Sequence, residues 1–168
     1  RNIGIPEWHT LPTYQSRGGY ASWEKVAGGM KPEQLIDEVK ASGLRGRGGA
    51  GFPTGMKWSF VPKDSPKPKY LVCNADESEP GTFKDRLLIE DDPHAIIEGT
   101  LIAAFAIRSH TAFIYVRGEL AFGAARLERA VAEAYRAGYI GNNIFASGYV
   151  LDLIVHSRAG AYISRQRT

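Results

Sequence analysis

The sequence is poor in cysteine, and this excludes several kinds of site. Among 168 residues Cys73 is the sole cysteine. One thiol cannot form an internal disulfide, which fits a reducing compartment. It also cannot hold an iron–sulfur cluster or a cysteine-rich zinc site within this chain. Because Cys73 lies in a short apolar run, we expect a buried small hydrophobe rather than a nucleophile.

Long apolar runs are lacking as well. The longest, residues 95–107, contains Glu98 and falls short of the ~20 residues that cross a bilayer. The first ten residues include Glu7 and His9 and have no apolar core, so no secretory signal is visible. We therefore expect membrane association only through a partner. The chain begins with Arg1 rather than Met, which suggests an incomplete N-terminus.

The histidines are few, and none has a second ligand at a recognisable metal spacing. No metal site is predicted. His94 follows a proline at a helix start, so a packing or surface role is expected. Phe113 and Tyr115 lie in an apolar strand and are expected in the core.

The charge is divided between two neighbouring segments. Hydrophobic residues make up 43% and charged residues 23%, as in globular proteins, and the net charge is +3. Residues 40–69 hold seven Lys or Arg against one acid, whereas residues 74–98 hold eight acids against two bases. The mild overall basicity therefore does not indicate nucleic-acid binding. This division of charge suggests a site that binds an anion at one edge and needs carboxylates at the other.

Hydrophobic periodicity predicts alternating helices and strands. The predicted helices are 32–41, one beginning at 92–93, and 120–137, and the predicted strands are 70–73, 112–116 and 151–155. Asp92 is expected to cap the second helix, and Arg129 and Glu133 to pair on the exposed face of the third. This order favours an α/β domain with a mainly parallel sheet. We assign residues 31–163 to this domain, residues 1–30 to an irregular leader packed on it, and residues 164–168 to a divergent tail.

The glycine-rich segment Gly46–Gly55 (GRGGAGFPTG) is a candidate anion site. Its glycines let the backbone adopt positive φ and present several N–H groups to one phosphate. Arg47 and Lys57 add positive charge, and Phe52 offers a flat face to an aromatic ring. The segment matches G-x-G-x-x-G but follows a helix, and the Walker pattern is not met. A flexible linker and an RNA-binding RGG segment are the alternatives, opposed by the flanking apolar residues and by the motif being single.

An acidic segment, residues 74–80 (NADESEP), follows the first predicted strand as a polar loop. It places Asp76, Glu77 and Glu79 within four residues. Ligands of such sheets bind beyond the carboxyl ends of the strands. Sugar hydroxyls, ring N–H donors, a metal or cationic residues could orient these carboxylates, and a solvated acidic turn is the alternative. If they form a site with the glycine-rich segment, residues 46–55 and 74–79 must share one cavity.

Taken together, SGLRGRGGAGFPTGMKWSF, KYLVCNADESEPGTFKDRLLIEDDPHAIIEG and YVRGE are far more specific than any single motif. They resemble the NADH- and FMN-binding subunit of respiratory complex I, the F subunit of NADH-quinone oxidoreductase, from about Gly4 to Ile163. The resemblance implies a Rossmann-like α/β domain, with a parallel-type sheet flanked by helices. It implies oxidation of NADH by hydride transfer to FMN, with electrons passed towards iron–sulfur clusters and quinone.

The resemblance also assigns roles to residues. Phe52 and Phe60 match aromatic residues that stack on the adenine, Lys57 matches a basic residue at the cofactors, and Glu79 matches a carboxylate beside the nicotinamide and is the candidate catalytic residue. The implied cofactor-binding residues are Gly46, Arg47, Gly48, Gly49, Ala50, Gly51, Phe52, Pro53, Thr54, Gly55, Lys57, Phe60, Asn74, Asp76, Glu77, Glu79 and Tyr162. Hydride transfer between stacked rings needs positioning and exclusion of water rather than an acid or base.

The implied partners are the other peripheral-arm subunits of complex I, above all the 2Fe-2S (E-type) subunit, and NADH. The implied location is the cytoplasmic side of a bacterial inner membrane, or the matrix side of the mitochondrial one, with only indirect membrane contact.

The last residues depart from the family pattern. The family continues Gly-Ala-Tyr-Ile with Cys-Gly-Glu-Glu-Thr, whereas Gly160–Ile163 is followed here by Ser164–Thr168 (SRQRT). The glutamate pair expected to contact flavin and NADH is missing, and so is the family's 4Fe-4S segment. We therefore expect a C-terminally truncated, impaired chain that binds FMN weakly or not at all alone. We also expect poor solubility or oligomerisation of the chain expressed alone, from an open sheet edge and uncovered helix faces.

Two alternative functions stay open. The same motifs fit the diaphorase subunit of an NAD-linked hydrogenase or formate dehydrogenase, although the leader PEWHTLPTYQSRGGY is more typical of complex I. The second alternative is a non-catalytic fragment that acts only as an interaction module.

Overall fold

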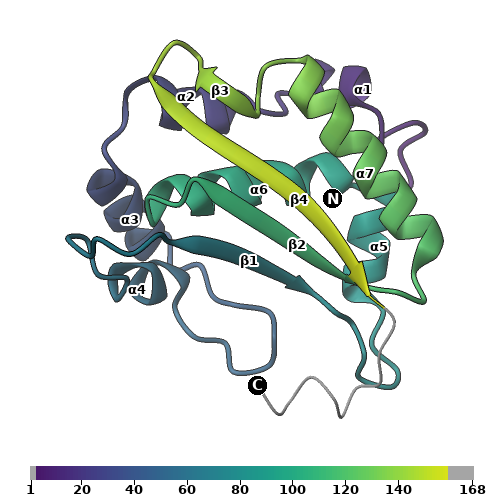
Figure 1. Cartoon of the computed structure of the whole chain (residues 1–168). Helices are drawn as coiled ribbons and strands as arrows, with labels where there is room; N and C mark the ends of the chain where they lie inside the picture. Colours follow the sequence, from purple (N-terminus) through teal and green to yellow (C-terminus); the bar gives the residue numbers. More distant parts are fainter. Residues whose placement is uncertain (1–2, 159–168) are drawn as a thin grey trace.

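The computed structural model describes residues 3–158, and within them four strands form one sheet in the order β1-β2-β4-β3 (Figure 1). The strands are β1 Tyr70–Ala75, β2 Thr111–Arg117, β3 Gly141–Ile144 and β4 Tyr149–Arg158. β1, β2 and β4 are parallel, and β3 adds an antiparallel edge beside β4. The predicted α/β class with a mainly parallel sheet is confirmed.

Helices precede and separate the strands. They are α1 Leu11–Ser16, α2 Ala21–Gly29, α3 Pro32–Ala41, α4 Thr54–Ser59, α5 Lys84–Asp91, α6 Pro93–Ala106 and α7 Ala121–Arg136. α6 packs against β1 and β2, and α7 packs along β4 (Figure 1). None of the helices in residues 3–158 is long and apolar enough to traverse a bilayer.

The sheet has one buried and one open face. In β2, the small and aliphatic side chains of Ala112, Ile114 and Val116 are fully buried beneath the helices. Phe113 and Tyr115 alternate with them and are only half-buried on the other face, so the prediction that they belong to the core is wrong. The period of two residues in a strand separates these two sets.

The leader is not irregular, which corrects the prediction for residues 1–30. It contains α1 and α2, and its aromatic residues Trp8, Tyr14 and Trp23 are buried in the common core. Both helices are short, so tertiary packing rather than a long local pattern fixes them. The expectation that the aromatic residues pack on the domain is confirmed.

Glu98 of α6 holds the leader through three hydrogen bonds. It accepts from the Tyr14 hydroxyl at 2.5 Å, from the Tyr20 backbone N–H at 3.0 Å and from the Trp23 backbone N–H at 3.1 Å. Burial, with Glu98 as a further cause, raises the pKa of the Tyr14 hydroxyl well above its ordinary value. That hydroxyl therefore stays protonated and remains a donor.

His94 extends this cluster to α7. Its Nε2 lies 3.2 Å from Glu133 Oε2, and its Nδ1 lies 2.9 Å from the Tyr20 hydroxyl. A carboxylate only accepts, so Nε2–H donates to Glu133 and Nδ1 accepts from Tyr20. Burial lowers the pKa of His94, which is consistent with a neutral ring. We call Tyr14, Tyr20, His94, Glu98 and Glu133 the buried polar seam.

Several finer predictions need correction. Glu133 also accepts from the Leu11 N–H and pairs with His94, so the predicted pairing with Arg129 is wrong. Asp92 stands at the start of α6, but its side chain makes no capping hydrogen bond. Cys73 is half-buried, and burial raises the pKa of its thiol, as a packing role predicts.

Candidate functional site

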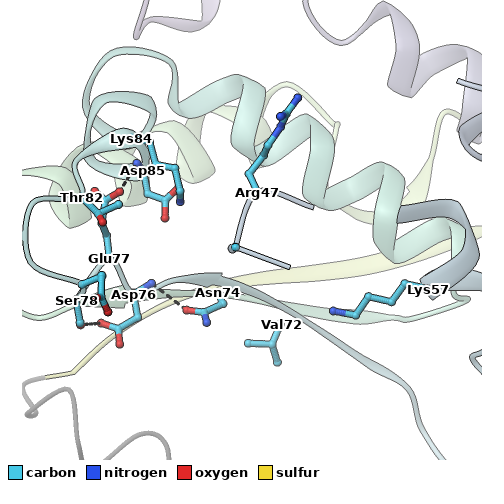
Figure 2. A pocket seen from close by; sticks show the side chains of 13 residues that line it. Arg47, Lys57, Val72, Asn74, Asp76, Glu77, Ser78, Thr82, Lys84 and Asp85 are labelled. Carbon is cyan, nitrogen blue, oxygen red and sulfur yellow. Dashed lines mark hydrogen bonds and ion pairs between the residues drawn. The ribbon is translucent and has the colours of Figure 1, made fainter. Parts of the chain in front are cut away.

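An open cavity of about 980 Å³ lies between the glycine-rich segment and the carboxyl end of β1 (Figure 2). Its lining residues are Arg47, Gly48, Gly49, Lys57, Val72, Asn74, Asp76, Glu77, Ser78, Glu79, Thr82, Lys84 and Asp85. The expectation that residues 46–55 and 74–79 share one cavity is confirmed. Cofactor pockets typically measure about 300–1,000 Å³, so the volume suits a ligand of nucleotide size.

The glycine-rich segment is a closed loop. Arg45 and Pro53 form an antiparallel bridge, and the Gly46 N–H donates to the Phe52 carbonyl at 2.9 Å. The Arg45 guanidinium donates to the carbonyl of Gly51 at 3.1 Å. These bonds join the two ends of the loop and argue against a flexible linker.

Glycine is required within the loop for conformational reasons. Gly49 has φ +108° and Gly51 has φ +60°, backbone conformations that other residues adopt only with strain. A Cβ at Gly48 or Gly49 would meet no heavy atom within 4 Å, because both positions face open space. The exposed backbone is thus accessible to a ligand.

Helix α4 anchors the second end of the loop. A Cβ added at Gly55 would lie 2.6 Å from the Lys40 nitrogen and 3.0 Å from the Ile36 carbonyl oxygen of α3. Only glycine permits this close approach. Lys57, one turn along α4, extends into the cavity towards Asn74 (Figure 2).

The opposite wall begins within β1. Asn74 belongs to the strand rather than to the predicted loop, and with Val72 it lies on the exposed face. Its side-chain oxygen accepts from the Asp76 N–H at 3.0 Å, and Asp76 accepts from the Ser78 hydroxyl at 2.8 Å. These short-range bonds turn the chain so that amide, carboxylate and hydroxyl groups follow one another along the wall.

Glu77 is bonded differently from its neighbours. It is 8% exposed, whereas Glu79 is exposed. Its two carboxylate oxygens accept from the backbone N–H groups of Asp85 at 2.8 Å and Arg86 at 2.9 Å, at the start of α5. Its carbonyl oxygen accepts from Arg117 Nη1 at 3.3 Å.

The charges are separated along the cavity, as their division along the sequence suggests. Carboxylate and hydroxyl side chains gather at one end, and Lys57 enters from the other (Figure 2). Lys84 Nζ lies 2.7 Å from Asp85 at the acidic end. Within residues 3–158, no three His, Cys, Asp or Glu side chains are grouped so as to hold a metal ion. The arrangement suits an elongated ligand with an anionic group and a polar, hydrogen-bonding remainder.

Some predicted site residues do not line the cavity. Gly46, Ala50, Gly51, Pro53, Thr54 and Gly55 complete the loop or begin α4 outside the lining set. Phe52 and Phe60 are also outside this set and are exposed, with ring centroids 6.2 Å apart and planes inclined by 55°. Tyr162 lies outside the described residues.

Sequence reasoning missed five lining residues: Val72, Ser78, Thr82, Lys84 and Asp85. Val72 could have been found from the alternation of β1, because it is two residues before Asn74. Lys84 and Asp85 reach the cavity because α5 begins there, and this helix had no strong periodic signal.

Comparisons relate the chain to known proteins. Residues 39–168 match the model of the family described as the Nuo51 FMN-binding domain. An NADH-quinone oxidoreductase F subunit of Rhizobium meliloti is 53% identical over all of this chain and 40% of the relative. The F subunit of Streptomyces coelicolor is 57% identical over 95% of this chain and 35% of the relative.

A solved structure of similar fold is the crystal structure of an NAD⁺-reducing NiFe hydrogenase in the H2-reduced state. Its TM-score is 0.73 at 35% identity, covering 91% of this chain and 26% of that chain. The chain spans about 40% of the length of the first curated relatives that it matches.

Proposed function

The chain belongs to the Nuo51 FMN-binding domain family, and on this premise we propose that it forms the FMN- and NADH-holding part of an NADH-quinone oxidoreductase flavin subunit. One observation carries the proposal: a glycine loop beside cations and a strand end bearing carboxylates line the same cavity. For the enzyme complex that contains such a flavin subunit, we propose oxidation of NADH, with electrons passed towards iron–sulfur clusters and quinone.

The residues present fit FMN by their chemistry. The accessible backbone of Gly48 and Gly49, with Arg47 and Lys57, offers donors and positive charge to a phosphate. Asn74 and Asp76 offer an amide and a carboxylate to ribityl hydroxyls and ring N–H groups. When bound, the flavin supplies an acceptor for the hydride of NADH.

The remaining tasks are positioning and shielding. Glu79 lies on the cavity wall, where we propose that it orients the nicotinamide amide. The exposed rings of Phe52 and Phe60 are available to stack on the adenine. Close stacking of two rings accelerates hydride transfer by proximity, so these residues need to bind and orient rather than exchange protons.

The test is a titration of the full chain with FMN, followed by quenching of flavin fluorescence, with riboflavin as the matched ligand without a phosphate. We expect weak, saturable, one-to-one FMN binding, and riboflavin binding weaker by at least roughly tenfold because it lacks the charge-assisted bonds. The expected weakness reflects Ser164–Thr168, where the family has its glutamate pair. Of the two outcomes expected from the sequence, weak binding and none, we propose weak binding, so absence of saturable quenching by FMN would refute the proposal. Equal affinities for FMN and riboflavin would refute the phosphate assignment.

A hydrogenase diaphorase module is the second candidate. It is favoured by the fold similarity to the NAD⁺-reducing hydrogenase at 35% identity. The two related F subunits are 53% and 57% identical, which favours the quinone-linked enzyme. Co-purification from the native source separates the two, since a 2Fe-2S (E-type) subunit with quinone-linked subunits supports the first and a nickel-containing subunit supports the second. We also propose a peripheral location on the cytoplasmic or matrix side of the membrane, which is tested by whether protease added to sealed inside-out membrane vesicles digests the chain.

A further inference from the structure

The wall that carries the cavity carboxylates has little burial of its own. From Glu79 through Lys84 the residues are exposed, and α5 begins at Lys84. The wall residues Asp76 and Ser78 precede this stretch, and Thr82 lies within it. Something else must fix the position of this loop relative to β1.

Glu77 provides that attachment on one side. A carboxylate that accepts two N–H groups at the start of a helix forms charge-assisted bonds, which the partial positive charge of the helix end strengthens. The donors belong to Asp85, which lines the cavity, and to Arg86. Glu77 thus bonds one half of the wall to the other.

Arg117 provides a second attachment, from the carboxyl end of β2. Its Nη1 donates to the Glu77 carbonyl, and its Nε lies 3.0 Å from Glu119 Oε2. The pKa of Glu119 is lowered by its own backbone N–H and by Arg117, so the carboxylate stays charged and orients the guanidinium. The Glu77 backbone and side chain are therefore held by different elements.

We propose that Glu77 is a positioning residue, anchored by Arg117, that sets the shape of the acidic wall through α5 instead of binding the cofactor by its own carboxylate. The effect of Glu77 on FMN binding rests on the proposed function. A wall of fixed shape lowers the entropy cost of ordering the site when FMN binds. Glu79 carries the same carboxylate on the same wall but is exposed, so it serves as the matched control for Glu77.

The test is amide hydrogen exchange on the full, cofactor-free chain. Glu77→Gln keeps the shape but replaces one acceptor by a donor, so exchange at Asp85 and Arg86 should accelerate by roughly tenfold or more. Glu79→Gln removes the same charge and should leave those amides unchanged. Arg117→Lys shortens the second anchor and should accelerate exchange at Ser78, whose N–H donates to the Asp76 carbonyl. This variant carries the test if circular dichroism shows that Glu77→Gln does not fold.

FMN titration of the same variants completes the test. Glu77→Gln should weaken FMN binding by roughly tenfold, and Glu77→Asp, which keeps the charge, should restore part of the loss. Unchanged exchange at Asp85 and Arg86 would overturn the proposal, whether or not FMN affinity falls. Accelerated exchange with unchanged FMN affinity would overturn it as well. If the wild-type chain binds no FMN, the proposed function fails, and the exchange result alone still decides whether Glu77 sets the wall.

Discussion

The buried polar seam and the cavity use similar side chains for different purposes. In the seam, Glu98 accepts three hydrogen bonds from neutral donors, and His94 is paired through both ring nitrogens. In the cavity, Glu79 is exposed and Lys57 extends into open space. Burial with satisfied bonds makes a polar group part of the framework, whereas an open position leaves it available to a ligand.

The most damaging change should be in the seam. Glu98→Ala leaves three buried donors without their acceptor, so we expect the free energy of unfolding to fall by about 3 kcal/mol or more. Urea unfolding followed by circular dichroism measures this free energy of unfolding. Glu128→Ala, at an exposed position of α7, is the control and should change it by less than about 0.5 kcal/mol. A loss equal to that of the control would show that the seam does not hold the leader.

The second change compares two glycines of the loop region. Gly55→Ala forces a Cβ against the α3 backbone and should destabilise by about 1–3 kcal/mol. Gly48→Ala has space for its methyl group and should leave unfolding unchanged, but the methyl group obstructs an anion and should weaken FMN binding. Thermal unfolding and FMN titration of both variants give the result. If both variants change unfolding, or both change only FMN binding, the proposed difference between the two glycines is wrong.

Removing a cavity cation should have a smaller effect, confined to binding. Lys57→Met should weaken FMN binding about tenfold, with unfolding unchanged, because one charge-assisted bond is lost. The exposed Lys67→Met is the matched control and should bind FMN as the wild type does. Raising the salt concentration should narrow the difference between Lys57→Met and the wild type. Equal affinities of the two variants would remove Lys57 from the site.

The smallest predicted effect is the pH dependence of stability that comes from His94 in the buried polar seam. Burial lowers the pKa of His94 below its unfolded value of about 6.5. The unfolded chain therefore takes up a proton first as the pH falls. The free energy of unfolding that is present above pH ~6.5 is lost as the pH falls from this value towards the lower folded pKa. Unfolding midpoints measured between pH 7.5 and 5.5 should decline less for His94→Gln. The exposed His110→Gln should follow the wild type, and an identical slope in all three proteins would contradict a neutral buried ring.

Sequence reasoning predicts the elements whose pattern is local. α3 matches its predicted range, and β2 and α7 each differ from theirs by one residue at each end, because apolar spacing, proline and glycine mark them directly. The elements α1, α2, α5 and β3 are short and depend on distant partners: Glu98 holds α1 and α2, Glu77 bonds the start of α5, and β3 pairs with β4. No local window contains that information.

The same limit applies to the site. The glycine loop and the acidic segment hold unusually many glycines and carboxylates, so the sequence predicts both as site segments. The cavity is lined by residues of each. The bonds of Glu77 to α5 could not be predicted, because they depend on where a helix begins seven residues later.

The two cavity walls are joined by residues 61–69, which contain no helix or strand and lie mostly on the surface. The entropic cost of closing such a connection grows only with the logarithm of its length. Natural variation in the number of residues between the two motifs should therefore concentrate there, while spacing inside each motif stays constant. For the experimenter, this connection is a place to insert a fluorophore that reports on occupancy.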